Sequence, residues 1–437
     1  MNSLNWLGKV PERWNVLKLR QMLTPFSEKN HPNMPLLSVV REKGVIIRNI
    51  EDKEENNNYV PDDLSGYKLV KKGQFAMNKM KAWQGSYGIS KYDGIVSPAY
   101  FVFDINHDMN KDFFNLAIRS KVYVNYFGQS SDGIRVGQWD LSMKRMKEIP
   151  FFLPPRSEQD QIVKFLDWKV SCINKLISNY REQIRSFQEF RIALVDTVIT
   201  HGLNKNITLK SSSSSWIKKI PKHWELIKLK RLVTLSETKV VNSKLPYIGM
   251  ENVVSWKGTY HIDNKVVPES VCPIFSSGNI LFGKLRPYLA KAIITESDGI
   301  CSGEFLVFKN IKCNTKFLLY YLLSQRFIDN INSSTYGAKM PRANWSYIGT
   351  QFIPVPPDVE QEEIVLYLDM QCKKIDEAVN IIDKKISNLL ELRTCLISNV
   401  ITGKIDIRNI EIPEYDSVEE ETDNIVADSE IEEGSEE

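Results

Sequence analysis

The fold is decided by residues 166–198, which read LDWKVSCINKLISNYREQIRSFQEFRIALVDTV. Apolar residues recur in this stretch at alternating spacings of four and three, from Leu166 through Ile173 and Ile177 to Val198. The stretch contains no Gly or Pro, and a period of ~3.5 residues sustained in this way is typical of a coiled-coil seam. The pattern therefore predicts one long helix with a single apolar edge.

A second copy of this pattern lies at residues 368–400, which read LDMQCKKIDEAVNIIDKKISNLLELRTCLISNV. Adding 202 to each seam position of the first stretch gives a seam position of the second, and even the charged position recurs as Arg191 and Arg393. Each stretch ends one half of the chain. We therefore expect the two helices to pair with each other as an antiparallel coiled coil, the alternative being that each packs only on its own domain.

The flanking segments are duplicated as well. Residues 6–20 recur at 216–230, with two tryptophans and a proline at matching places, and both helices are preceded by the pattern Pro-Pro-x-x-Glu-Gln, at Pro154–Gln159 and at Pro356–Gln361. Matched positions of this kind indicate an internal repeat. The tryptophans are interpreted as packing anchors. Trp139 and Trp345 are taken as counterparts, which makes the segment between the tryptophan and the Pro-Pro pair longer in the first half.

Between these frames lie two divergent domains. Short β-like runs at 36–40, 44–50, 74–77 and 99–103 surround a helix expected at 113–124, and the second half repeats this outline at 226–354 with a helix at 317–323. The predicted fold class is α+β: two mixed α/β domains separated by two long helices, in a pseudo-twofold tandem repeat. The predicted segments are domain 1 at 1–155, helix 1 at 156–202, a linker at 203–215, domain 2 at 216–357, helix 2 at 358–403, and an acidic, disordered tail at 404–437.

The charge distribution points to nucleic acid. The net charge is only +3, but residues 411–437 hold 13 acidic residues and no Lys or Arg, so the other 410 residues carry a formal charge of +16. A basic body favours a polyanionic partner, although charge can also serve solubility alone. The tail is interpreted as solubilising, the alternative being a regulatory mimic of DNA. No signal peptide and no apolar run long enough to span a membrane is visible, so a cytoplasmic protein without membrane contact is expected.

Signals for catalysis are missing from the sequence. No P-loop, GxGxxG motif or glycine-rich loop for S-adenosylmethionine is present, the five histidines are scattered, and the six cysteines show no CxxC spacing. We therefore expect a non-catalytic chain with no catalytic residue, no metal site and no cofactor of its own.

Basic residues with interspersed aromatic and amide side chains recur at equivalent places in both halves. Lys and Arg neutralise phosphates, while Arg, Gln and Asn can bind base edges in the major groove. Any one of these lysines could equally be ordinary solvated surface; their recurrence is the stronger signal. The predicted DNA-binding residues are Lys79, Lys81, Gln84, Arg135, Gln138, Lys144 and Arg145 in the first half and Lys284, Arg286, Lys291, Lys339, Arg342 and Asn344 in the second.

With these residues in view, the chain resembles the DNA-specificity subunit of type I restriction-modification systems. The resemblance rests on the repeated Trp-Pro-Trp segments, the two Pro-Pro-x-x-Glu-Gln patterns and the Val-Ile-Thr helix ends, and it covers roughly residues 6–403. It implies that each domain is a target recognition domain for one half of a split double-stranded DNA site. It also implies that the paired helices hold two methyltransferase subunits, which carry S-adenosylmethionine, and that restriction subunits join the complex.

Apolar residues outside the seam, Phe165, Leu176 and Leu390, are the predicted partner-binding positions. Two other readings stay open. A stand-alone DNA methyltransferase or nuclease with diverged motifs would bind its cofactor or metal without partners. A coiled-coil scaffold with no role on DNA would show no salt-dependent duplex binding.

Overall fold

The structure is a computed structural model that describes residues 10–41, 43–48, 61, 63–131, 139–204, 206–212, 214, 216–241, 245–262, 270–337 and 340–418. The chain divides into two compact units. Unit 1 comprises Met1–Tyr180 and Lys384–Glu437, and unit 2 comprises Arg181–Asp383. The boundaries fall inside the two long helices, so each unit contains one mixed domain, the beginning of one long helix and the end of the other.

The two long helices are α5 (Arg156–His201, 46 residues) and α10 (Asp358–Ile401, 44 residues). The positions with the four–three spacing, from Leu166 to Val198 and from Leu368 to Val400, are all buried or partly buried, and none of them is exposed. The predicted seam is therefore confirmed. Both helices begin at the expected residue, Arg156 or Asp358, and end within two residues of the expected boundary.

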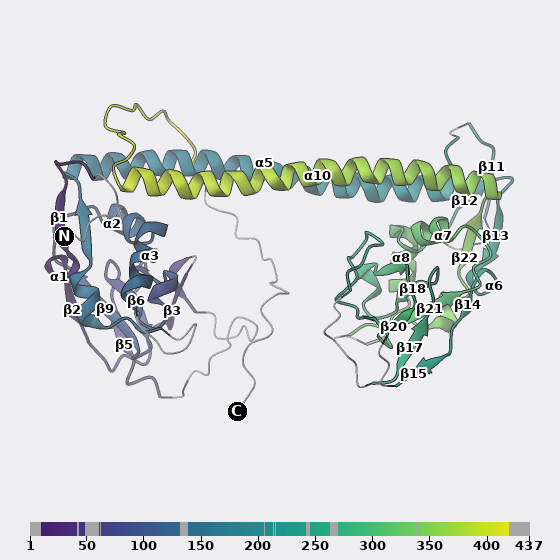
Figure 1. Cartoon of the computed structure of the whole chain (residues 1–437), viewed down its shortest axis with the longest axis horizontal. Helices are drawn as coiled ribbons and strands as arrows, with labels where there is room; N and C mark the ends of the chain where they lie inside the picture. Colours follow the sequence, from purple (N-terminus) through teal and green to yellow (C-terminus); the bar gives the residue numbers. More distant parts are fainter. Residues whose placement is uncertain are drawn as a thin grey trace. The chain divides into compact units, whose positions relative to one another are not determined.

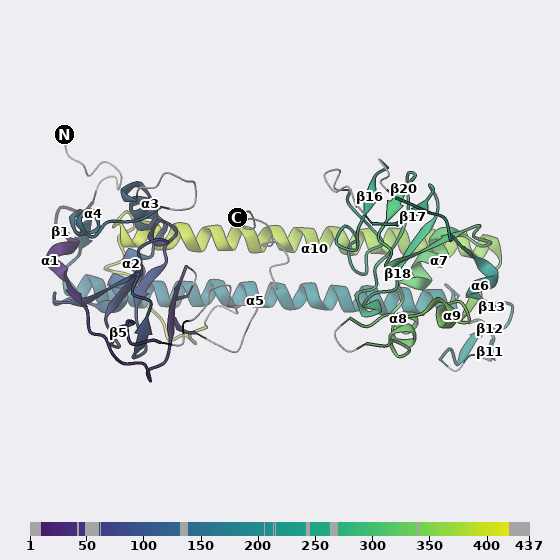
Figure 2. The same ribbon diagram turned by 90° about the horizontal axis from the view of Figure 1, so that it is seen from below.

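The helices pair antiparallel within each unit. In unit 1 Arg393 Nη1 donates a hydrogen bond to Asn174 Oδ1 at 3.1 Å, and in unit 2 Arg191 Nη1 lies 2.7 Å from Asp376 Oδ1. Arg191 and Arg393 are the two charged seam positions, which correspond at an offset of 202. Their partners, Asp376 and Asn174, correspond at the same offset. Figures 1 and 2 both show α5 and α10 side by side in each unit. The reciprocal contacts explain why a charged residue interrupts each apolar seam.

Unit 1 is built on the four-stranded antiparallel sheet β2-β9-β6-β7, with α2 and α3 packed near it. Its core gathers phenylalanines from the sheet and helices, among them Phe75, Phe103 and Phe114. The strands are β1 (Asn15–Lys18), β2 (Leu23–Phe26), β3 (Leu37–Val40), β4 (Gly44–Ile47), β5 (Lys68–Val70), β6 (Phe75–Asn78), β7 (Tyr87–Ile89), β8 (Gly94–Val96), β9 (Tyr100–Ile105) and β10 (Pro150–Leu153). The short helices are α1 (Leu19–Met22), η1 (Ala82–Gln84), α2 (Lys111–Ile118), α3 (Lys121–Ser130) and α4 (Met143–Glu148).

Unit 2 repeats this plan with the four-stranded sheet β14-β21-β18-β19. In both units the strand before the domain pairs with the strand after it, β1 with β10 and β13 with β22. The strands are β11 (Leu209–Ser211), β12 (Lys219–Pro221), β13 (Glu225–Lys228), β14 (Thr234–Leu235), β15 (Lys239–Val240), β16 (Tyr247–Ile248), β17 (Cys272–Phe275), β18 (Ile280–Gly283), β19 (Ala292–Ile294), β20 (Gly299–Cys301), β21 (Phe305–Lys309) and β22 (Phe352–Val355). The helices are α6 (Leu229–Leu232), η2 (Pro287–Leu289), α7 (Thr315–Leu322), α8 (Gln325–Asn332) and α9 (Trp345–Ile348).

The predicted α+β class and the tandem repeat are confirmed, with local differences. The helix expected at 113–124 is two helices, α2 and α3, because Ser120 adopts an extended backbone (φ −67, ψ 154) between them. Part of the expected linker is structured, since β11 pairs antiparallel with β12. The expected run at 44–50 is β4 up to Ile47, and residues 49 and 50 lie outside the described residues.

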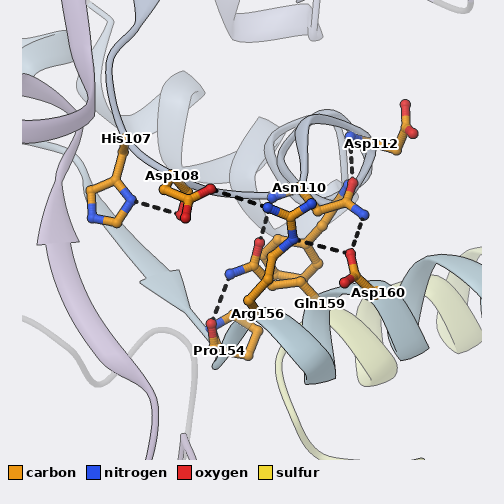
Figure 3. A network of polar contacts seen from close by, with 9 residues as sticks. His107, Asp108, Asn110, Asp112, Pro154, Arg156, Gln159 and Asp160 are labelled. Atoms are coloured by element: carbon orange, nitrogen blue, oxygen red, sulfur yellow. Dashed lines mark hydrogen bonds and ion pairs between the residues drawn. The ribbon is translucent and has the colours of Figure 1, made fainter.

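The Pro-Pro-x-x-Glu-Gln pattern fixes each long helix to its domain. Gln159 Oε1 accepts a hydrogen bond from the Asn110 N–H at 2.8 Å, and its Nε2 donates to the Pro154 carbonyl at 2.8 Å (Figure 3). In unit 2 Gln361 makes the same two bonds, to Asn314 at 2.7 Å and to the Pro356 carbonyl at 2.8 Å. Both glutamines are buried. The asparagines are the N-caps of α2 and α7, so one side chain ties the domain's helix to the start of the long helix.

The expectation of a disordered tail is wrong for residues 404–418. Ile407 is buried in the core of unit 1, and Gln161 Nε2 donates to the Ile407 carbonyl at 3.4 Å and to the Ile410 carbonyl at 2.8 Å. Further along, Asn174 Nδ2 donates to the Val418 carbonyl at 3.0 Å. This C-terminal segment therefore lies along the first half of α5. Residues 419–437, which hold most of the acidic residues, lie outside the described residues.

Candidate DNA-binding loops

Basic loop 1, residues 79–84, connects β6 to β7 in unit 1. Backbone hydrogen bonds from Lys81 N to Asn78 O and from Gln84 N to Lys81 O shape the turn, and Gly85 closes it with φ +94, a left-handed conformation that favours glycine. The Leu141 N–H donates to the Lys79 carbonyl at 3.2 Å, which joins the loop to the segment before α4. The structure thus brings Lys79, Lys81 and Gln84 onto one stiff loop.

Basic loop 2, residues 284–291, occupies the corresponding place in unit 2, between β18 and β19. The Ala343 N–H donates to the Lys284 carbonyl at 2.9 Å, as Leu141 does in unit 1, and Arg286 N donates to the Pro341 carbonyl at 2.7 Å. Arg286 and Ala290 adopt left-handed φ values of +48 and +46, which are costly for residues other than glycine. The hydrogen bonds that join the loop to Pro341 and Ala343 hold its backbone in this strained conformation.

These shared contacts correct the expected correspondence of the tryptophans. Leu141 matches Ala343, and the next residues, Ser142 and Asn344, are the N-caps of α4 and α9. Both pairs differ by 202, the same offset as the helices, so the segment is equally long in the two halves and Trp139 is not the counterpart of Trp345. Trp139 packs instead against Trp83 of basic loop 1, with ring centroids 5.1 Å apart.

The pairing position, which we define as the residue before Leu141 or Ala343, differs between the units. It is Asp140 in unit 1, whose Oδ2 lies 3.2 Å from Lys79 Nζ. It is Arg342 in unit 2, whose guanidinium binds the Glu304 carboxylate with Nη2–Oε1 at 2.9 Å. The same backbone framework therefore presents an acidic side chain in one unit and a basic one in the other.

Several predicted residues have structural roles or lie elsewhere. Lys291 Nζ donates to the Met250 carbonyl at 2.7 Å, and the Asn344 side chain caps α9 by accepting from the Ser346 N–H at 3.1 Å. Lys144 and Arg145 are exposed in the first turn of α4, which follows directly on Leu141. The predicted residues Arg135, Gln138 and Lys339 lie outside the described residues.

Sequence reasoning missed two lysines next to basic loop 1. Lys29 and Lys68 face each other in an isolated antiparallel bridge, and Lys68 Nζ donates to the Tyr100 carbonyl at 2.7 Å. Burial lowers the pKa of Lys68, and the nearby charges of Lys29 and Lys79 lower it further. Like charges gathered in this way favour an anion such as a phosphate. No local sequence signal connects residues 29, 68 and 79, because only the sheet brings them together.

The predicted partner-binding residues have different environments. Phe165 is 4% exposed in the core of unit 1, so its assignment to a partner surface is wrong: it packs against Trp168 with ring centroids 6.0 Å apart. Leu176 is 48% exposed, and Leu390 is partly buried.

In the described part of the chain, no helix has the length and apolar character needed to span a membrane. No group of three or more His, Cys, Asp or Glu side chains in the described ranges is arranged to hold a metal ion. All six cysteines are unpaired thiols, and burial raises the pKa of Cys301 to about 12.

The family model for the type I restriction modification DNA specificity domain matches the chain twice, at residues 11–185 and 221–392. Since these matches cover most of the sequence, the chain belongs to the family of type I restriction-modification DNA-specificity subunits, and its two mixed domains are DNA recognition domains. Each matched range begins near the duplicated tryptophan segment and ends within a long helix, which agrees with the two units.

Curated relatives and solved structures agree with this membership. The chain is 22% identical to the EcoDI specificity subunit of Escherichia coli over 74% of this chain and 77% of that protein. It is 22% identical to the MjaVIII specificity subunit of Methanocaldococcus jannaschii over 92% of this chain and 95% of that protein. A chain from a type I system studied for complex assembly and conformational transition has a similar fold, with a TM-score of 0.63, 15% identity, and coverage of 91% of this chain and all of that one.

Proposed function

We propose that the two units each recognise one part of a bipartite, asymmetric target in double-stranded DNA. The observation that carries this proposal is the pairing position, which in both units precedes the residue that donates to the basic loop, Leu141 or Ala343, but holds Asp140 in one unit and Arg342 in the other. Two frameworks of the same design bind the duplex in the same manner, while different side chains select different bases. A target with two unlike parts follows.

Within each loop the residues divide by role. Lys79, Lys81 and Lys284 bind phosphates, together with Lys29 and Lys68, because their ammonium groups carry no geometric code for a base. Gln84, Arg286 and Arg342 bind base edges, with Arg145 beside the first loop and Asn344 beside the second, and Lys144 joins the phosphate contacts. Three more assignments rest on sequence alone. Arg135 and Gln138 bind base edges beside basic loop 1, and Lys339 binds a phosphate beside basic loop 2.

The chain itself is non-catalytic in this proposal and uses no cofactor. Two methyltransferase subunits bind the long helices and supply S-adenosylmethionine and the transfer chemistry, and restriction subunits join them. Large apolar side chains exposed on both helices support such a docking surface, since a partner helix could cover them. They are Leu176 and Phe190 on α5, and Val359, Leu366, Met370, Ile381 and Leu392 on α10.

The decisive experiment compares DNA methylation in cells with and without this gene, and S-adenosylmethionine binding by the isolated chain. We expect one bipartite methylated motif to disappear with the gene, and no cofactor binding without partners. Cofactor binding by the isolated chain would favour the stand-alone methyltransferase. Absence of any salt-dependent duplex binding by the complex would favour the scaffold without a DNA role.

The docking proposal is tested by Leu176→Asp combined with Leu390→Asp. Because charged groups are costly to bury in an apolar interface, the methyltransferase subunits should bind at least tenfold more weakly in a pull-down or titration. The matched control is Gln188→Asp together with Glu391→Gln, which changes exposed polar residues of the same helices. If the complex stays intact after the apolar pair is changed, the docking surface lies elsewhere.

The helices also set the distance between the two half-sites. α5 rises about 69 Å over its length and continues from one unit into the other. Deleting one heptad from each helix, Ile177–Gln183 and Val379–Lys385, keeps the seam in register and shortens it by about 10 Å, close to three base pairs. Methylation should move to sites with the same half-sites and a shorter spacer. Unchanged spacing would show that the helices are not the ruler.

A further inference from the structure

The backbone of Arg342 is held from both sides. Arg342 and Tyr336 exchange two backbone hydrogen bonds of 3.1 and 3.2 Å, and Leu285 of basic loop 2 forms an isolated bridge with Arg342. The neighbouring residues Pro341 and Ala343 each bond to basic loop 2. The arginine therefore projects from a framework that cannot shift without breaking several hydrogen bonds.

The side chain of Arg342 is oriented as firmly as its backbone. Nε lies 3.2 and 3.1 Å from Oε1 and Oε2 of Glu304, and Nη2 lies 2.9 Å from Oε1. Glu304 thus occupies the Nε–Nη2 edge of the guanidinium. Among the described residues no hydrogen bond reaches Nη1, so the edge formed by Nη1 and Nη2 keeps donors for a ligand.

The exposure of the pair suits a surface that closes on DNA. The Arg342 side chain is 36% exposed and that of Glu304 is 26% exposed, so both are partly accessible from solvent and the arginine is the more exposed of the two. Tyr336, 61% exposed, and Met340 flank the arginine and can exclude water from a base edge. In unit 1, Ala99 corresponds to Glu304 and Asp140 corresponds to Arg342. The same ion pair therefore cannot form in unit 1.

We infer that Glu304 and Arg342 form one base-reading pair, in which Glu304 orients Arg342 for two parallel hydrogen bonds to O6 and N7 of a guanine in the major groove. Arg342 contacts the base, and Glu304 is a positioning residue that acts through it. Arginine matches guanine because its fork of donors fits the two acceptors of that base. This inference rests on the proposed DNA recognition by unit 2.

The test is a binding selection with the full chain assembled with its methyltransferase subunits, using a duplex library randomised over both half-sites. The native complex should select guanine at one position of the half-site bound by unit 2. Arg342→Lys keeps the charge but loses the fork, so the preference for guanine at that position should fall about tenfold or more. Preferences at the other positions should stay the same.

Glu304→Gln separates positioning from mere stability. It should lower the guanine preference several-fold at that same position, and it should add nothing in the Arg342→Lys background, because both changes act through one contact. Arg326→Lys is the matched control: Arg326 also binds a carboxylate, with Nε 2.7 Å from Asp196 Oδ2, but on α8. That control should leave every preference unchanged.

Three results would overturn the inference while leaving the proposed function intact. These are a guanine preference that survives Arg342→Lys, an effect of Glu304→Gln that adds to it, and a loss spread evenly over all positions. If Glu304→Gln removes a preference that Arg342→Lys leaves intact, the carboxylate is the base reader and the inference fails. A native complex that shows no preference at all in this half-site would instead contradict the proposed recognition by unit 2.

Discussion

Unit 1 and unit 2 share one design but are completed by different parts of the chain. In unit 2 the end of α5 runs directly into the segment that leads to Trp224, and a Cβ on Gly202 would lie 3.2 Å from that indole. In unit 1 the same place beside Trp14 is filled by Gly403, at the end of α10, so the closing segment comes from the opposite end of the chain. In unit 2 the helix end that packs on the tryptophan is joined to the domain by the chain itself, whereas in unit 1 it is held there by non-covalent contacts.

In unit 1, side chains of α5 bind the C-terminal segment that follows α10. Asp376 of unit 2 corresponds to Asn174 of unit 1, and only the amide can accept from Arg393 and also donate to the Val418 carbonyl. Ser171 accepts from the Val418 N–H at 3.2 Å, and the Tyr415 hydroxyl binds Asp167. Divergence between the two helices is therefore partly an adaptation to the C-terminal segment.

The largest expected effect is on unit 1 alone. Ending the chain after Gly403 removes the buried Ile407 and the bonds from Gln161, and should lower the free energy of unfolding of unit 1 by roughly 3–5 kcal/mol. Hydrogen exchange should become faster in unit 1 and stay the same in the domain of unit 2. A chain ending after Val418 is the control and should match the full chain. Equal losses in both units would contradict the difference in closure.

The next effect should be the same in both units. Gln159→Ala leaves the partly buried Asn110 N–H and the buried Pro154 carbonyl without their partner, and Gln361→Ala does the same in unit 2. Each should cost about 2–4 kcal/mol in urea unfolding, because unsatisfied buried groups keep their desolvation penalty. Gln188→Ala, at an exposed position of α5, is the control. A large difference between the two variants would show that the units do not use the pattern alike.

A smaller effect distinguishes Asn174 from Asp376. Asp376→Asn weakens a partly exposed ion pair with Arg191 and should cost up to about 1 kcal/mol. Asn174→Asp creates that ion pair with Arg393 but loses the donor to Val418, so it should be nearly neutral in the full chain. In the chain ending after Gly403 the same change should stabilise by about 0.5 kcal/mol. Stabilisation of equal size in both chains would mean that the bond to Val418 contributes nothing.

The smallest expected effect concerns phosphate contacts, which both units should share. Replacing Lys79 or Lys284 by Gln should weaken binding to all duplexes and reduce the slope of log K against log salt by about one unit each. Lys373→Gln, which changes a strongly exposed lysine of α10, is the control and should leave the slope unchanged. A loss restricted to particular sequences would reassign either lysine as a base reader.

The sequence alone determined the parts of this protein that rest on local periodicity and duplication. The seam of α5 and α10 was predictable because a heptad pattern states which face of a helix is covered, whatever covers it. The tandem repeat, the domain frames and the basic loops were predictable because matching residues recur at a nearly constant offset. The family followed from the same repeated segments.

Only the tertiary structure decided which distant residues meet. Phe165 looked like a partner surface because its helical position is next to the seam, yet the domain of unit 1 covers it. The sheet brings Glu304 to Arg342 and Lys29 to Lys68, and the C-terminal segment finds Asn174 across more than half of the chain. Such contacts carry no local signal, because a side chain's hydrogen-bond partner depends on how strands and helices pack and not on its neighbours in sequence.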